Sequence, residues 1–207
     1  MPTFFSDLSP LEQVMSFLAD TYLGYAARYL PFALLAGGVF LAARYLWVKR
    51  TGQQFRGWTE GTRALLVCYL AALLLVVWIP YPGSPLFASW SFDFVPTLLA
   101  WAVNYSPIFP SWSVAMLILN VLLFVPVGLL LPLVLRRNTW WRVGLACLAA
   151  TLAIELVQPL VDRSGDIDDV LCNLAGSAIG FGLYKLLDKL LPRFTARCRP
   201  AAQATHS

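Results

Sequence analysis

Residues 64–81, "ALLVCYLAALLLVVWIPY", form a continuous apolar run. A helix that crosses a bilayer needs about 20 mostly apolar residues, so this run predicts a membrane-spanning helix at residues 63–81. Strands of a membrane barrel would instead alternate between apolar and polar residues over about ten positions. The sequence therefore predicts an all-α polytopic transmembrane bundle of about five spans. The other four spans are predicted near residues 28–48, 113–135, 140–160 and 170–191.

The composition supports this fold class. Of the 207 residues, 59% are hydrophobic and only 13% are charged, and the mean hydropathy is +0.68. This balance lies outside that of soluble globular domains. The net charge of +4 does not by itself indicate nucleic-acid binding, because the basic residues are confined to particular segments of the chain. We expect a lipid bilayer as the surroundings and no nucleic-acid partner.

The distribution of Lys and Arg predicts how the chain is oriented. The segments that follow the first, third and fifth predicted spans are basic, whereas residues 1–27 and 82–112 contain no Lys or Arg. Because basic segments stay on the cytoplasmic side, we expect the N-terminus outside and the C-terminus in the cytoplasm. The basic residues concerned are Lys49, Arg50, Arg56, Arg63, Arg136, Arg137, Arg142, Lys189, Arg193, Arg197 and Arg199.

Three regions are expected along the chain. Residues 1–62 hold a short helix lying on the membrane surface, an additional span and a basic cytoplasmic loop; residues 63–191 hold four spans; and residues 192–207 form a basic, polar cytoplasmic tail. The long connection at residues 82–112 is rich in Pro and aromatic residues, and we expect it to cover the outer face. The four cysteines are scattered among spans and loops, so no structural disulfide is predicted.

Polar residues inside the predicted spans point to a site. Thr151, Glu155 and Gln158 are spaced i, i+4 and i+7, which places them on one face of the fourth span. We expect Glu155 to be the only carboxylate buried in a span. Inserting a carboxylate there costs on the order of 3 kcal/mol, so it is normally kept for a binding site, an ion or a proton path. Glu155 is therefore the candidate catalytic residue.

The third and fifth spans carry polar residues at a similar depth. Asp169, Asn173, Gly176 and Gly180 share one face of the fifth span, where the glycines form a groove that another helix can approach closely. Asn120 lies in the third span. For each asparagine alone, an interhelical hydrogen bond that holds the bundle together is the simpler interpretation.

Acidic residues gather in the turn before the fifth span. Asp166 or Asp168 can cap the helix that follows, but capping does not explain Asp162, Asp166, Asp168 and Asp169 together, because like charges this close repel one another. Arg163 or a hard cation would compensate them. Asp166, Asp168 and Asp169 are therefore candidate ligands of a Mg²⁺ or Ca²⁺ ion, although the EF-hand spacing is absent.

Three segments together resemble the VanZ-like family of bacterial membrane proteins: "NVLLFVPVG" (120–128), "IELVQ" (154–158) and "RSGDIDDVLCNLAG" (163–176). The resemblance covers about residues 63–190. One departure is Leu174, where the family usually has Thr. The positions that match the family pattern are Asn120, Phe124, Pro126, Gly128, Glu155, Gln158, Arg163, Asp166, Asp169, Asn173 and Gly176.

The resemblance implies a multi-pass protein of the bacterial inner membrane, and the family is named for a protein linked to teicoplanin resistance. We favour a non-enzymatic envelope protein whose outward-facing polar pocket binds a lipid-linked precursor, a glycopeptide-like ligand or a membrane protein partner, because no nucleophile with an adjacent base is recognisable. The candidate ligand-binding residues are Asn120, Glu155, Gln158, Arg163, Asp166, Asp169 and Asn173.

The alternative is a membrane-embedded, metal-dependent enzyme that acts on a polyprenyl-phosphate-type lipid. In this hypothesis Asp166, Asp168 and Asp169 hold Mg²⁺, Arg163 clamps the phosphate, and Glu155 is the general acid or base. A proton-coupled transporter ranks last, because the sequence contains no inverted repeat.

Overall fold

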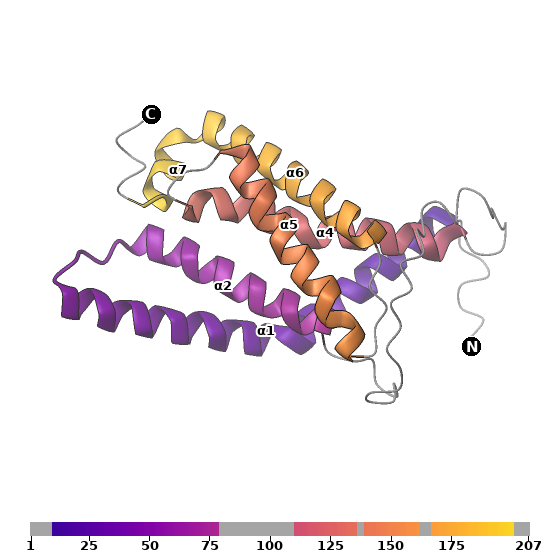
Figure 1. Ribbon diagram of the computed structural model, residues 1–207, viewed down its shortest axis with the longest axis horizontal. Coiled ribbons are helices and arrows are strands. Elements are labelled where there is room, and N and C mark those ends of the chain that lie inside the picture. Colours follow the sequence, from indigo (N-terminus) through magenta and orange to yellow (C-terminus); the bar gives the residue numbers. More distant parts are fainter. Residues whose placement is uncertain (1–9, 79–109, 136–138, 162–166, 201–207) are drawn as a thin grey trace.

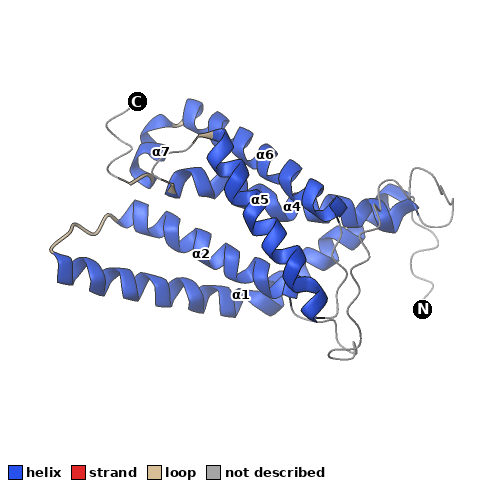
Figure 2. Cartoon of the chain, viewed as in Figure 1, coloured by secondary structure: helices blue, strands red, loops and turns tan. Residues whose placement is uncertain are grey.

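Figure 1 presents the computed structural model of the chain, which describes residues 10–78, 110–135, 139–161 and 167–200. All regular elements in these ranges are helical, as the blue ribbons of Figure 2 show, which confirms the predicted all-α class. The helices are α1 (Pro10–Thr51), α2 (Gly57–Trp78), α4 (Pro110–Val134), α5 (Trp140–Val157), the 3₁₀ turn η2 (Gln158–Val161), α6 (Ile167–Leu190) and α7 (Pro192–Cys198).

Five of the helices in the described residues are long and apolar enough to cross a membrane, which confirms the predicted number of spans. The second begins earlier than predicted, because α2 continues on the N-terminal side of its apolar run through Glu60 and Arg63. The spans are Ala26–Thr51, Gly57–Trp78, Leu117–Val134, Trp140–Val157 and Ile167–Leu190. Which end of the bundle faces the cytoplasm stays a prediction.

Helix α1 is one continuous element of 42 residues. At 1.5 Å per residue its length is about 63 Å, twice the roughly 30 Å thickness of a bilayer core. The surface helix and the first span expected from the sequence are therefore joined without a break. Pro31 lies inside this helix and cannot donate the hydrogen bond that continues it. Figure 1 shows α1 changing direction along its length.

The closest packing in the bundle is between α4 and α6. A Cβ atom added at Gly176 would collide with the backbone carbonyl of Val121, and one added at Gly128 would collide with the backbone of Ser177. Gly180 faces the backbone of α4 in the same way. The predicted glycine groove is thus confirmed, and α4 is the helix that occupies it.

The basic segments lie at one end of the bundle. Figure 1 shows the α1–α2 turn, the start of α5 and α7 at the same end, whereas α6 begins at the opposite end. The segment predicted as a tail is structured over residues 192–200. The Oγ1 atom of Thr59 in α2 lies 3.1 Å from the carbonyl oxygens of both Arg197 and Arg199, so the C-terminal segment is docked onto the start of α2.

Two other expectations concern the connections and the cysteines. All four cysteines are free thiols. The connection at residues 82–112, which we expect to cover the outer face, lies outside the described residues except for the first turn of α4.

Candidate polar site between α4, α5 and α6

The polar stripe of the fourth span is buried in the bundle. Thr151, Glu155 and Gln158 are 0%, 4% and 6% exposed, so all three face protein rather than lipid, as their spacing predicts. Helix α5 ends at Val157, and Gln158 keeps helical backbone geometry and opens η2. Pro159 has no backbone N–H group, so it cannot donate the next hydrogen bond of an α-helix. Gln158 therefore lies where the span gives way to the acidic turn.

Hydrogen bonds join the three helices at this level. In the interior, the Nδ2 atom of Asn173 in α6 donates to the Oγ1 atom of Thr151 in α5 over 2.7 Å. Asn120 in α4 donates from its own Nδ2 atom to the Oδ1 atom of Asp169 at the start of α6. The interhelical role that we considered the simpler interpretation for both asparagines is thus confirmed.

Glu155 is not the only buried carboxylate at this level of the bundle. Besides Glu155, Asp168 is buried, with 3% of its surface exposed, and Asp169 is partly buried. Both aspartates lie in the first turn of α6, where negative charge is favourable. Each of the three carboxylates has an interaction partner. The expectation that Glu155 would be the only carboxylate buried in a span is wrong, because α6 already begins at Ile167.

Gln158 contains the unsatisfied group of the layer. Its Oε1 atom is buried, and it accepts no hydrogen bond from the described part of the chain. A buried acceptor without a donor costs about 1–3 kcal/mol. A donor that arrives from outside the chain would recover this free energy, so Gln158 marks a position at which a ligand can be recognised.

Two predicted site residues, Arg163 and Asp166, lie outside the described residues, as does Asp162. The candidate metal ligands are therefore represented by Asp168 and Asp169 alone. No group of three or more His, Cys, Asp or Glu side chains that could hold a metal ion occurs in the described ranges. A Mg²⁺ or Ca²⁺ site at this turn consequently stays an expectation that depends on Asp166.

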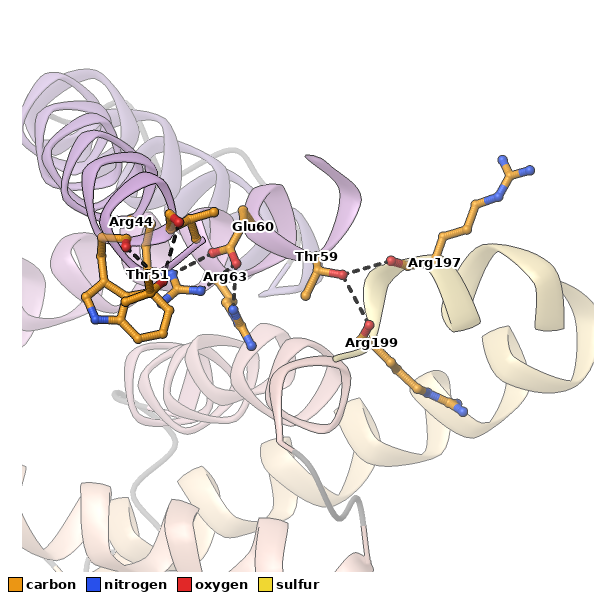
Figure 3. Close-up of polar contacts among 9 residues, drawn as sticks. Arg44, Thr51, Thr59, Glu60, Arg63, Arg197 and Arg199 are labelled. Atoms are coloured by element: carbon orange, nitrogen blue, oxygen red, sulfur yellow. Dashed lines mark hydrogen bonds and ion pairs between the residues drawn. The ribbon is translucent and has the colours of Figure 1, made fainter. Parts of the chain in front are cut away.

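A charged cluster at the other end of the bundle was not predicted from the sequence. Glu60 is 4% exposed and accepts two hydrogen bonds from Arg44, from Nε over 2.9 Å and from Nη2 over 2.7 Å. A third comes from the Nη1 atom of Arg63 over 2.7 Å, and Figure 3 shows both guanidinium groups directed at this carboxylate. Arg44, an arginine inside the first apolar run, was the available signal, because such a charge requires a partner.

Comparison with known proteins identifies the family of the chain. The family model described as VanZ/LLP1 matches residues 66–188. The matched region contains all of α4 and α5 and most of α2 and α6, and the polar residues between α4, α5 and α6 that are described above lie within it. Searches of curated proteins and of solved structures give no match.

Proposed function

This chain belongs to the VanZ/LLP1 family, and we propose that it is a non-enzymatic protein of the bacterial inner membrane whose polar layer binds an envelope ligand. The ligand class is a lipid-linked precursor or a glycopeptide-like molecule, and binding would alter susceptibility to teicoplanin. The polar layer comprises Asn120, Thr151, Glu155, Gln158, Asp168, Asp169 and Asn173.

The observation that carries this proposal is the unsatisfied Oε1 atom of Gln158. Asn120 and Asn173 donate hydrogen bonds to Asp169 and Thr151, respectively. These bonds hold the three helices together without any contribution from Gln158. An apolar residue would fill the same space at lower cost, since a buried polar group without a partner destabilises the fold. The amide of Gln158 is explained if its Oε1 atom accepts a hydrogen bond from a ligand that binds reversibly.

The chemistry of the layer specifies what that group is. Gln158 offers an acceptor, and Glu155 lies one turn away on the same buried face as a carboxylate. Acceptors recognise N–H and O–H donors. Sugar hydroxyls and peptide amides provide such donors, and both are found in lipid-linked envelope precursors and in glycopeptides. We therefore propose that the sugar or peptide portion of the ligand, rather than its phosphate, contacts Gln158.

The test is thermal unfolding of the purified chain in detergent with three probes: a polyprenyl phosphate, a polyprenyl-linked disaccharide peptide and teicoplanin. At a hundred times its dissociation constant a ligand adds about 2.7 kcal/mol of stability. We expect a rise in Tm for the wild type with the disaccharide peptide or with teicoplanin. Gln158→Leu should lose this rise while being at least as stable as the wild type without ligand.

Tyr69→Phe is the matched control. It removes an interhelical hydrogen bond, from the Tyr69 hydroxyl to the Leu123 carbonyl over 2.7 Å, at a site outside the polar layer. It should lower Tm and keep the ligand-induced rise. The proposal fails if none of the probes shifts the wild type, or if Gln158→Leu responds as strongly as the wild type does.

The enzymatic alternative requires a bound metal ion. It requires Asp166 to join Asp168 and Asp169 around Mg²⁺, and the described residues supply only two of these three ligands. Mg²⁺ bound there would neutralise the phosphate of a lipid substrate. Phosphate release from a polyprenyl phosphate by the wild type, abolished in a folded Glu155→Gln variant, would favour this alternative over the proposal.

A further inference from the structure

The cluster around Glu60 contains more positive charge than its carboxylate requires. Arg44 binds both carboxylate oxygens of Glu60 in a bidentate arrangement, and Arg63 binds one of them as well. One guanidinium group would neutralise Glu60. Since Arg44 and Arg63 are both 24% exposed at the side chain, the second positive charge is not forced by burial.

The two guanidinium groups also keep unused hydrogen-bond donors. Each arginine carries five N–H donors, and Glu60 takes two from Arg44 and one from Arg63. The remaining donors form no hydrogen bond with the described residues. The guanidinium carbon of Arg44 lies 4.6 Å from the centre of the Trp47 ring, a cation–π contact that fixes its orientation. The free donors are therefore held in place rather than mobile.

These donors line a cavity of about 860 Å³ between α1, α2 and the docked C-terminal segment. Arg56 joins Arg44 and Arg63 in its wall, and Gln53 and Gln54 add amide groups. Against these three arginines stands the single carboxylate of Glu60, which leaves a formal excess of two positive charges. The cavity also opens at the start of α2, where backbone N–H groups add to the positive potential. Its charge and donors suit an anion.

The position of the cavity indicates which anion it binds. Trp47 in its wall and the neighbouring Trp58 are 45% and 57% exposed, and such tryptophans mark the head-group level of a bilayer. The anion present at that level is a lipid phosphate, which guanidinium groups bind in bidentate fashion. We propose that this cavity binds the phosphate of an anionic phospholipid head group. The site lies at the opposite end of the bundle from the polar layer and does not depend on the proposed function.

The competing interpretation is that the cluster only fastens α1 to α2. Fastening accounts for Arg44 and Glu60, whose removal would leave a buried charge unpaired. It does not account for Arg56, whose exposed side chain forms no hydrogen bond or ion pair with the described residues. Arg56 and Arg63 are therefore the residues that distinguish binding from fastening.

The experiment measures lipid binding by the full chain in nanodiscs of a zwitterionic phosphatidylcholine to which phosphatidylglycerol or cardiolipin is added. The readouts are the rise in Tm and the affinity. We expect the anionic lipids to bind in preference to phosphatidylcholine. Arg56→Gln should weaken this binding at least tenfold, because one charged hydrogen bond is lost, while leaving Tm in pure phosphatidylcholine unchanged. Arg63→Gln should act similarly, since Glu60 keeps its bidentate partner.

Arg197→Gln is the matched control. It removes the same charge at the same end of the bundle, but its side chain points away from the cluster in Figure 3. We expect it to bind anionic lipid as the wild type does. Equal weakening in Arg197→Gln and Arg56→Gln would show general electrostatic attraction and overturn the proposal. A Tm rise with inorganic phosphate alone, matching that with lipid, would overturn the lipid source of the phosphate.

Discussion

The contact between α4 and α6 can be tested by adding one methyl group at either of two positions on the same helix. At Gly176 a Cβ atom would collide with the Val121 carbonyl and lie 3.2 Å from the Cβ atom of Phe124. At Gly182 nothing lies within 4 Å of the added atom. The substitutions Gly176→Ala and Gly182→Ala therefore differ in their surroundings and in nothing else.

The expected magnitudes follow from this difference. Replacing a helical Gly by Ala stabilises a helix by about 1 kcal/mol, which both variants gain. Overpacking costs about 1–3 kcal/mol, and only Gly176→Ala incurs it, because a carbonyl in a rigid helix cannot move aside as a side chain would. We expect Gly182→Ala to be more stable than the wild type by about 1 kcal/mol. Gly176→Ala should then lie about 1–3 kcal/mol below Gly182→Ala.

The assay is thermal unfolding in detergent, followed by circular dichroism and by labelling of Cys147, which is fully buried. In a protein of this size 1 kcal/mol corresponds to about 2–4 °C in Tm, so the two variants should differ by roughly 2–12 °C. Earlier labelling of Cys147 in Gly176→Ala would show that the bundle opens. Equal Tm values for the two variants would refute the packing derived from the glycine positions.

Three further outcomes are expected from the polar contacts. Thr151→Val leaves the buried Nδ2 atom of Asn173 without its acceptor and should lower the free energy of unfolding by about 1–3 kcal/mol, measured by thermal unfolding; an unchanged Tm would contradict the hydrogen bond. Tyr69→Phe removes the hydrogen bond to the Leu123 carbonyl and should lower the free energy of unfolding by about 0.6 kcal/mol, the average for side-chain hydrogen bonds between membrane helices, and by no more than about 1.7 kcal/mol. If the acidic turn holds a cation, Mg²⁺ or Ca²⁺ should raise Tm in the wild type and not in Asp169→Asn, and chelation should reverse the rise; a rise of the same size in both proteins would place the ion elsewhere.

Much of the fold was predictable because a bilayer requires long apolar segments, which are visible in the amino-acid sequence. The apolar runs predicted all five spans, since a spanning helix must be apolar over its whole length. The glycine face of α6 was predictable from Gly176 and Gly180, because their spacing places both on one side of the helix. The helix that packs against this face was not predictable, because the sequence does not specify which helix enters a groove. Gly128 matches the family pattern, but its packing against Ser177 follows only from the structure.

The candidate site was likewise predictable only in part. Periodicity predicted that Thr151, Glu155 and Gln158 share a buried face, but not that Asn173 bonds Thr151, because bond partners depend on the rotation of two helices about their axes. Glu60 was missed for another reason. Hydropathy ends a span where charge begins, whereas paired charges allow a helix to continue, as α2 does through the contacts with Arg44 and Arg63.

The docking of the C-terminal segment has a consequence for biosynthesis. Thr59 contacts the carbonyl groups of residues 138 and 140 positions further along the chain. The ribosome delivers the N-terminal spans to the membrane first. The start of α2 therefore lacks its contact with the C-terminal segment until the later spans have been inserted. The wall that Pro200 contributes to the cationic cavity is consequently completed only after the fifth span is in place. A nascent chain halted before α7 would contain the five described spans but lack this contact, so the contact reports that the segment after the fifth span has docked.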